Sequence, residues 1–279
     1  MNSILKQIII PFKLPKWIIS SDVKIMDNSH PFTKQFVMRY YRQFGWNGIC
    51  IHPIMAEVIL KNKSDLKHTL FANPSPLLTE LIVEKFKPTL GNLYWLTTNI
   101  NPKLAKFIIS YRNNFDAKCW NNIMKNPNPE LTEFIKNFYQ VCADRSFINS
   151  NTNPELAELI LSISAFTDTF YMNPNPGLTD FLSKYPRLLS DNTNPDLAPI
   201  IIKVNGEKYK QVIYKNSNIG LTDFIINNPP QNNYECCLLM DNRNPKLTKL
   251  IYDNKRRIEG DWNYLGINKY IFEPVKLKL

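Results

Sequence analysis

The chain has 279 residues, of which 44% are hydrophobic and 12% aromatic, and a formal net charge of +10. This composition excludes an intrinsically disordered chain, because it provides enough apolar side chains to build a core. The length suits one extended array or two globular domains. At the start, residues 1–19 hold a short apolar run interrupted by Pro11 and Pro15. Since this run is too short for a signal peptide or a membrane span, we expect neither secretion nor membrane insertion.

One pattern, N-x-N-P-x-L-[TA], then recurs along most of the chain. Its first position falls at residues 28, 50, 73, 99, 126, 151, 173, 192, 216, 242 and 268. A period of about 20–50 residues is typical of a repeat array, in which each unit buries its apolar face against its neighbours. The first copies are degenerate. His30, His52 and Ser75 take the place of the second asparagine in them.

The second half of the pattern predicts the start of a short helix, which we name helix A. In the copy at residue 99, Asn101 is a favoured N-cap residue, because its side chain can accept an unpaired backbone N–H of the first turn. Pro102 suits the next position, where a missing N–H has no effect. Leu104, Phe107 and Ile108 then fall on one apolar stripe.

The residues before the pattern predict a second short helix, helix B, which ends at the first asparagine. An apolar residue stands three positions before that asparagine in nearly every copy. Asparagine tolerates the left-handed conformation of a helix C-cap, so we expect the first asparagine to adopt it. The apolar residues are Ile25, Leu70, Leu96, Ile123, Ile148, Phe170, Leu189, Ile213 and Leu239.

Helices A and B joined by tight turns form an αα-hairpin. We therefore expect an all-α fold, an α-solenoid of about ten hairpins of roughly 24 residues each. No linker divides the chain, so residues 1–279 are expected to form a single domain. Residues 1–27 would be an N-terminal cap, residues 28–268 the repeats, and residues 269–279 a C-terminal cap with a basic tail. The five cysteines form no CxxC pair, which favours free thiols in a reducing compartment.

Two segments carry a resemblance to a known family. They are Trp120-x-x-Ile123-x-x-Asn126-Pro127-Asn128 and Trp262-x-x-Leu265-x-x-Asn268. Both resemble the unit of the Asn-Pro repeat proteins of giant DNA viruses of the mimivirus type. The resemblance implies a helical repeat fold, no catalytic residues, and a location in the host cytoplasm (the virus factory) or the virion. The N-P-x-L-[TA] form used here departs from that family's unit.

The sequence predicts no catalytic, cofactor-binding or metal-binding residue. His30 and His52 stand in capping positions of degenerate copies, which favours a structural role over metal binding. The carboxylate pair Glu130 and Glu133 has a spacing that could serve acid–base chemistry, but Glu155 and Glu158 repeat it in phase. A catalytic pair should be unique. Acidic residues in a first helical turn instead complement the helix dipole.

The basic excess lies at the two ends of the chain, while the middle is nearly neutral with acids at repeated positions, and this gives two candidate surfaces. Stacked hairpins would align the acids of the middle into a ridge that could bind a basic protein, although dipole complementation explains them without function. These candidate partner-binding residues are Glu130, Glu133, Glu155, Glu158 and Asp180. The basic clusters could contact nucleic acid, or could be ordinary solvated surface. Their residues are Arg39, Arg42, Lys208, Lys210, Lys255, Arg256 and Arg257.

Two functions are consistent with these patterns, and neither is enzymatic. The first is a protein–protein interaction or scaffold module of a viral assembly. The second is a helical-repeat nucleic-acid binder, which should keep basic, polar or aromatic side chains at fixed exposed positions. The positions after proline are mostly acidic or small, as at Glu130, Gly177 and Asp196. This pattern favours the scaffold and leaves the opposite face open.

Overall fold

The computed structural model describes residues 41–250, apart from residues 63–65, 143, 164–165, 207–208, 241, 243 and 248–249. Within these residues the chain is all-α and contains no strand, which confirms the all-α part of the expected fold class. The caps expected at residues 1–27 and 269–279 lie outside the described part.

The α-helices are short. They are α5 (Tyr41–Ile51), α6 (Ala56–Lys61), α7 (Thr79–Lys85), α8 (Leu90–Thr97), α9 (Ala105–Ser110), α10 (Ala117–Lys125), α11 (Thr132–Phe138), α12 (Ala157–Ser162), α13 (Asp168–Tyr171), α14 (Thr179–Leu182), α15 (Ala198–Asn205), α16 (Lys210–Lys215), α17 (Thr222–Asn227) and α18 (Asn233–Met240).

Single turns or short runs of 3₁₀-helix stand between them. These are η1 (Pro53–Met55), η3 (His68–Ala72), η4 (Pro76–Leu78), η5 (Pro102–Leu104), η6 (Arg112–Asn114), η7 (Pro129–Leu131), η8 (Tyr139–Val141), η9 (Arg145–Ser150), η10 (Pro154–Leu156), η11 (Pro176–Leu178), η12 (Pro186–Leu188), η13 (Pro195–Leu197), η14 (Ile219–Leu221) and η15 (Pro245–Leu247).

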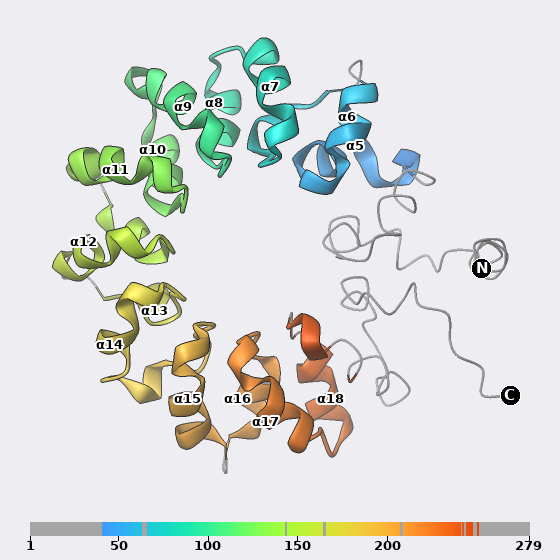
Figure 1. Ribbon diagram of the computed structural model, residues 1–279, viewed down its shortest axis with the longest axis vertical. Helices are drawn as coiled ribbons and strands as arrows, with labels where there is room; N and C mark the ends of the chain where they lie inside the picture. The colour runs from blue at the N-terminus through green and yellow to red at the C-terminus, as the bar shows by residue number, and fades with distance from the viewer. Residues whose placement is uncertain are drawn as a thin grey trace, which may run out of the picture.

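The helices follow a curve around an open centre, from α5 in blue to α18 in orange (Figure 1). Where the view separates the two layers, α11 and α14 lie on the outer side of the curve, and α10 and α13 lie nearer the centre (Figure 1). The outer helices belong to the A type and the inner ones to the B type. Successive B elements pack directly on one another, as η3 does on α8 and α8 on α10.

Each full copy of the pattern opens helix A in the way that the sequence predicts, with one addition. The Oδ1 atom of Asn101 accepts a hydrogen bond of 3.1 Å from the backbone N–H of Lys103, which confirms the N-cap. The residues Pro102–Leu104 first form a 3₁₀ turn, and α9 begins only at Ala105. In the degenerate copy at residue 73, Ser75 occupies the N-cap position but its side chain makes no capping bond.

The core runs through the array as one stripe of leucine from the A helices and one of aliphatic residues from the B helices. Leu104, Leu131 and Leu156 are all completely buried, as the pattern predicts. The residues three positions before the first asparagine, among them Ile123 and Ile148, are also completely buried. Aromatic rings fill the space between the layers, as where Trp120 stacks on Phe134 at a centroid distance of 5.7 Å.

The expected conformation of the first asparagine is wrong. Asn126 has φ −72° and ψ 117°, an extended conformation, and Asn73, Asn151 and Asn216 are close to it. Helix B ends instead through a 3₁₀-type bond, in which the N–H of Asn126 donates to the carbonyl of Ile123 at 3.1 Å. The extended conformation directs the asparagine side chain toward the preceding unit, where its amide group donates hydrogen bonds to backbone carbonyls.

Candidate functional site

The first asparagines of successive units form a continuous network that we call the asparagine ladder. Each side-chain amide donates two hydrogen bonds to backbone carbonyls of the preceding unit. The Nδ2 atom of Asn126 donates to the carbonyls of Thr97 and Asn99 at 3.0 and 2.9 Å. The same pair of bonds occurs at Asn99, Asn126, Asn151, Asn173, Asn192, Asn216 and Asn242.

The oxygen of each ladder amide serves its own unit. The Oδ1 atom of Asn126 accepts the backbone N–H of Asn128 at 3.0 Å, and so fixes the turn between the two asparagines. Asn126 is 3% exposed, and Asn99 and Asn151 are completely buried. A buried polar group is stable only when it is hydrogen-bonded, and three bonds nearly fill the capacity of an amide. The ladder thus fastens each unit to the one before it.

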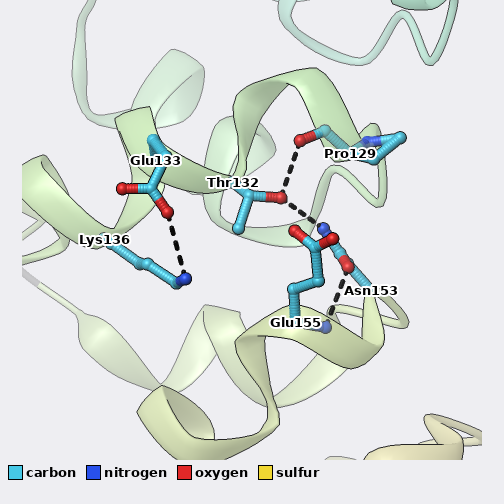
Figure 2. Close-up of polar contacts among 6 residues, drawn as sticks. All are labelled: Pro129, Thr132, Glu133, Lys136, Asn153 and Glu155. Carbon is cyan, nitrogen blue, oxygen red and sulfur yellow. Dashed lines mark hydrogen bonds and ion pairs between the residues drawn. The ribbon is translucent and has the colours of Figure 1, made fainter.

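The second asparagines add another set of bonds between units, and the set has two alternating forms. In one form, the Nδ2 atom of Asn153 donates at 2.7 Å to the hydroxyl of Thr132 in the preceding unit. That hydroxyl itself donates to the carbonyl of Pro129 at 2.7 Å, as Figure 2 shows. Asn101, Asn194 and Asn244 use Thr79, Thr179 and Thr222 in the same way.

In the other form an alanine replaces the threonine, and the amide bonds to backbone. Asn175 donates at 2.8 Å to the carbonyl of Asn153, whose unit carries Ala157. Asn128 and Asn218 do the same after the units of Ala105 and Ala198. The two types alternate without exception from Ala56 to Thr222: Ala56, Thr79, Ala105, Thr132, Ala157, Thr179, Ala198 and Thr222. The structural period is therefore two units.

Glycine accompanies the alanine form at two junctions. A Cβ added at Gly177 would lie 2.7 Å from the Cβ of Ala157, and one added at Gly220 would lie 2.7 Å from that of Ala198. Successive 3₁₀ turns therefore approach closely at these junctions. Glu130 follows Ala105 in the third such junction, and there the amide-to-carbonyl bond of Asn128 is longer, at 3.2 Å.

The candidate partner-binding acids lie on the A helices, in three consecutive units. Glu130 and Glu155 follow the capping asparagines in η7 and η10, and their backbone N–H groups each donate to the cap at 3.0 Å. Glu133, Glu158 and Asp180 stand in the first turns of α11, α12 and α14. All five side chains are exposed, so they are accessible to a partner.

One of these acids has a cation beside it, and the acidic run is short. The carboxylate of Glu133 pairs with Lys136 of its own helix at 3.1 Å, and Figure 2 shows it directed toward that lysine, away from Glu155. The equivalent positions on either side are Lys106 in α9 and Pro199 in α15, so the acidic run is limited to three units. A basic partner would therefore meet acids from three units, one of them already paired with Lys136.

Most of the candidate nucleic-acid-binding residues lie outside the part of the chain that the structure describes. They are Arg39, Lys208, Lys255, Arg256 and Arg257. Arg42 belongs to α5, and its side chain is also outside the described part. Lys210 is described: it is half-buried at the start of α16, and its Nζ atom lies 3.5 Å from the Oδ1 atom of Asn228. This lysine is thus engaged within the array.

The described part of the chain contains His, Cys, Asp and Glu side chains, the types that most often bind metals. No group of three or more His, Cys, Asp or Glu side chains among them could hold a metal ion. All five cysteines are free thiols, and Cys237 alone of the five is exposed. Burial raises the pKa of the Cys50, Cys119 and Cys142 thiols, which lowers their reactivity. In this part of the chain, no helix has the length and apolar character that crossing a membrane requires.

The ladder and the alternation are the parts of the molecule that the sequence pattern left unexplained. The signal for the alternation is present in the sequence, because the residue after the leucine changes regularly between Thr and Ala. The signal for the ladder is that the first asparagine occurs in every full copy of the pattern, while the residue that follows it differs from copy to copy. Comparison with known proteins adds nothing further, since no family, curated protein or solved structure matches this chain.

Proposed function

We propose that this chain is an α-solenoid of short αα-hairpin units that acts as a non-enzymatic scaffold and binds another protein within a viral assembly. The observation that carries the proposal is the contrast between constant buried residues and variable exposed residues within each unit. The buried asparagines are the same in all the full copies, while exposed positions of the same units differ, as at Lys103, Glu130 and Gly177. A fixed frame with variable exposed side chains is typical of repeat proteins that bind other proteins.

The acids of the A helices provide the surface for that partner. Glu130, Glu133, Glu155, Glu158 and Asp180 are all exposed and come from consecutive units, so an extended basic segment could contact several of them together. Lys136 is the one described cation paired with any of these five acids. A partner lysine or arginine would compete with it. We place the complex in the host cytoplasm or in the virion.

The test is affinity capture from infected cells with three forms of the full chain. The first is the wild type, and the second carries the amide at all five acids, as in Glu133→Gln and Asp180→Asn. The third is a control with amides at the exposed acids Glu57, Glu80, Glu84, Asp196 and Asp223, so the change in charge is the same. We expect a protein that the wild type and the control retain and that the five-acid variant loses. Equal retention by all three forms would refute the proposed surface.

A further inference from the structure

A second surface lies on the opposite side of the array, on the B elements. The residue three positions before each ladder asparagine is buried, as Leu70, Leu96 and Ile123 are. On an α-helix such as α8 or α10, the residues one, five and eight positions before that asparagine point the other way. On the 3₁₀ helix η3 the same positions are His68, which is exposed, and Ala72, which is half-buried. We call these positions on η3, α8 and α10 the inner face. The described residues of this face are His68, Ala72, Gly91, Tyr94, Thr98, Lys118, Asn121 and Lys125.

The inner face combines lysine with aromatic rings, and none of its eight described residues is acidic. The carboxylates of Asp116 and Asp144, from neighbouring positions, interact electrostatically with Lys118 and Lys125. Lys118 and Lys125 are exposed on α10, at positions that share one side of that helix. The Nζ atom of Lys125 lies 4.3 Å from the ring centroid of Phe147, so the side chain is held in place by a cation–π contact. The A helices of the same units carry both signs of charge, as Glu80 and Lys106 illustrate.

Three rings cluster where η3 packs against α8. The exposed ring of Tyr94 meets the half-buried Trp95 edge to face at 5.3 Å, and the exposed His68 lies 6.0 Å from Trp95. Gly91 lies one turn before Tyr94, and a Cβ added there would meet nothing within 4 Å. The helix surface at Gly91 is therefore open. Gly91 is the second residue of α8, in the first turn of the helix.

We propose that the inner face of η3, α8 and α10 binds single-stranded nucleic acid. The lysines of α10 would neutralise phosphates, and the rings of Tyr94 and His68 would stack on bases beside Gly91. Basic side chains next to exposed aromatic rings are the combination that binds single strands without strong sequence preference. The site differs in place and charge from the acidic surface proposed for a protein partner. The proposal stands independently of that function.

Binding is measured by fluorescence anisotropy of the full chain with labelled oligouridylate and oligothymidylate of about 15 nucleotides. We expect binding that weakens with salt. Lys118→Gln with Lys125→Gln should reduce the slope of log affinity against log salt by about 1.4, since each phosphate contact to a single strand contributes about 0.7. The matched control, Lys103→Gln with Lys106→Gln on the A side, should leave the slope unchanged. Binding of oligouridylate alone would assign the site to RNA. Binding of both oligonucleotides would show that the site accepts either RNA or DNA.

The rings are tested separately. Tyr94→Ala should weaken binding about 5- to 150-fold, the range found for removing one stacking ring. Gly91→Gln should also weaken binding by covering the rings, and since a Cβ added at Gly91 meets nothing within 4 Å, the variant should keep the wild-type melting temperature. Absence of binding at low salt would overturn the proposal. An equal loss of binding in the A-side control variant would also overturn it. The same holds if the inner-face variants lose the captured protein partner and still bind nucleic acid.

Discussion

At the scale of single residues, asparagine performs two structural tasks within each unit, and the first asparagine should matter more. Asn151→Ala removes donors to the carbonyls of Met124 and Asn126 and the acceptor for the N–H of Asn153. Each buried group left unpaired costs about 1–3 kcal/mol, so we expect a loss of at least about 2 kcal/mol in the free energy of unfolding. Asn153→Ala also removes an N-cap, for which losses of roughly 0.5–2 kcal/mol are usual.

Thr152 provides the control for this comparison, because it lies between the two asparagines and is exposed. Thr152→Ala should change the free energy of unfolding by less than about 0.5 kcal/mol. Urea denaturation of the three variants measures the order. If Asn151→Ala were as mild as Thr152→Ala, the ladder would contribute nothing to stability.

A second residue-scale prediction concerns alkaline pH. Burial raises the pKa of the Cys119 thiol from 9.0 to about 11, and the hydrogen bond with the side chain of Asp116 acts in the same direction. The unfolded chain therefore releases this proton at lower pH than the folded chain does. It follows that the contribution of Cys119 to stability is complete below pH 9 and decreases as the pH rises from about 9 to about 11.

The change to test is Cys119→Ala, which removes the thiol and keeps the backbone N–H that donates to the Asp116 cap at 2.8 Å. The free energy of unfolding of this variant should fall less steeply between pH 9 and 11 than that of the wild type. Cys237→Ala, at the exposed cysteine, should leave the wild-type slope unchanged. Identical slopes for Cys119→Ala and the wild type would show that the buried thiol has no part in the pH dependence.

At the scale of elements, the sequence predicts helix starts better than helix ends. The capping role of Asn101 and the burial of Leu104 follow from local rules, since both depend on neighbours within one turn. The end of helix B at Asn126 depends on carbonyls of the preceding unit, which are 27 and 29 residues away in the chain. Local propensity favoured a left-handed C-cap there, and the bonds between units override it.

The candidate sites divide in the same way. Exposure of Glu133 and Asp180 could be predicted, because both lie on the polar side of a short amphipathic helix. The pairing of Glu133 with Lys136 also follows from their spacing of three residues. The inner face could not be predicted, because its ring cluster joins His68 of one unit to Tyr94 and Trp95 of the next. That contact depends on how successive units pack.

At the scale of elements, the prediction concerns the close approach of two 3₁₀ turns at Gly177. Gly177→Ala would place a Cβ 2.7 Å from the Cβ of Ala157 and 3.1 Å from the carbonyl oxygen of Pro154. The two turns would have to separate, so we expect this variant to lose roughly 1–3 kcal/mol of stability, as overpacking usually does. Gly91→Ala is the control, since a Cβ added there meets nothing within 4 Å, and it should leave the stability unchanged or slightly higher. Thermal unfolding would contradict the close approach at η11 if both substitutions were stabilising.

At the scale of the whole molecule, the alternation of threonine and alanine units makes two units the building block from Ala56 to Thr222, while the next copy carries a second threonine in succession, Thr248. An asparagine amide reaches a hydroxyl at one junction and a backbone carbonyl at the next, as Asn153 and Asn175 show. The glycines at 177 and 220 follow alanine units, where the turns approach closely. An array of this kind should accept changes in length in steps of two units. A step of one unit would join two 3₁₀ turns whose residues do not pack against each other in the native array.

Deletions test this directly. Removing residues 173–191 joins the unit of Ala157 to the unit that contains Asp196. The Cβ of Asp196 would then occupy the position of Gly177, where an added Cβ lies 2.7 Å from the Cβ of Ala157. Removing residues 173–215 deletes two units and brings Gly220 to that place, which restores the native kind of junction. We expect the larger deletion to unfold at higher urea than the smaller one, although it discards more of the core. Adding Asp196→Gly to the smaller deletion should recover much of its loss. A smaller deletion that is the more stable of the two, with no gain from Asp196→Gly, would show that single units are interchangeable.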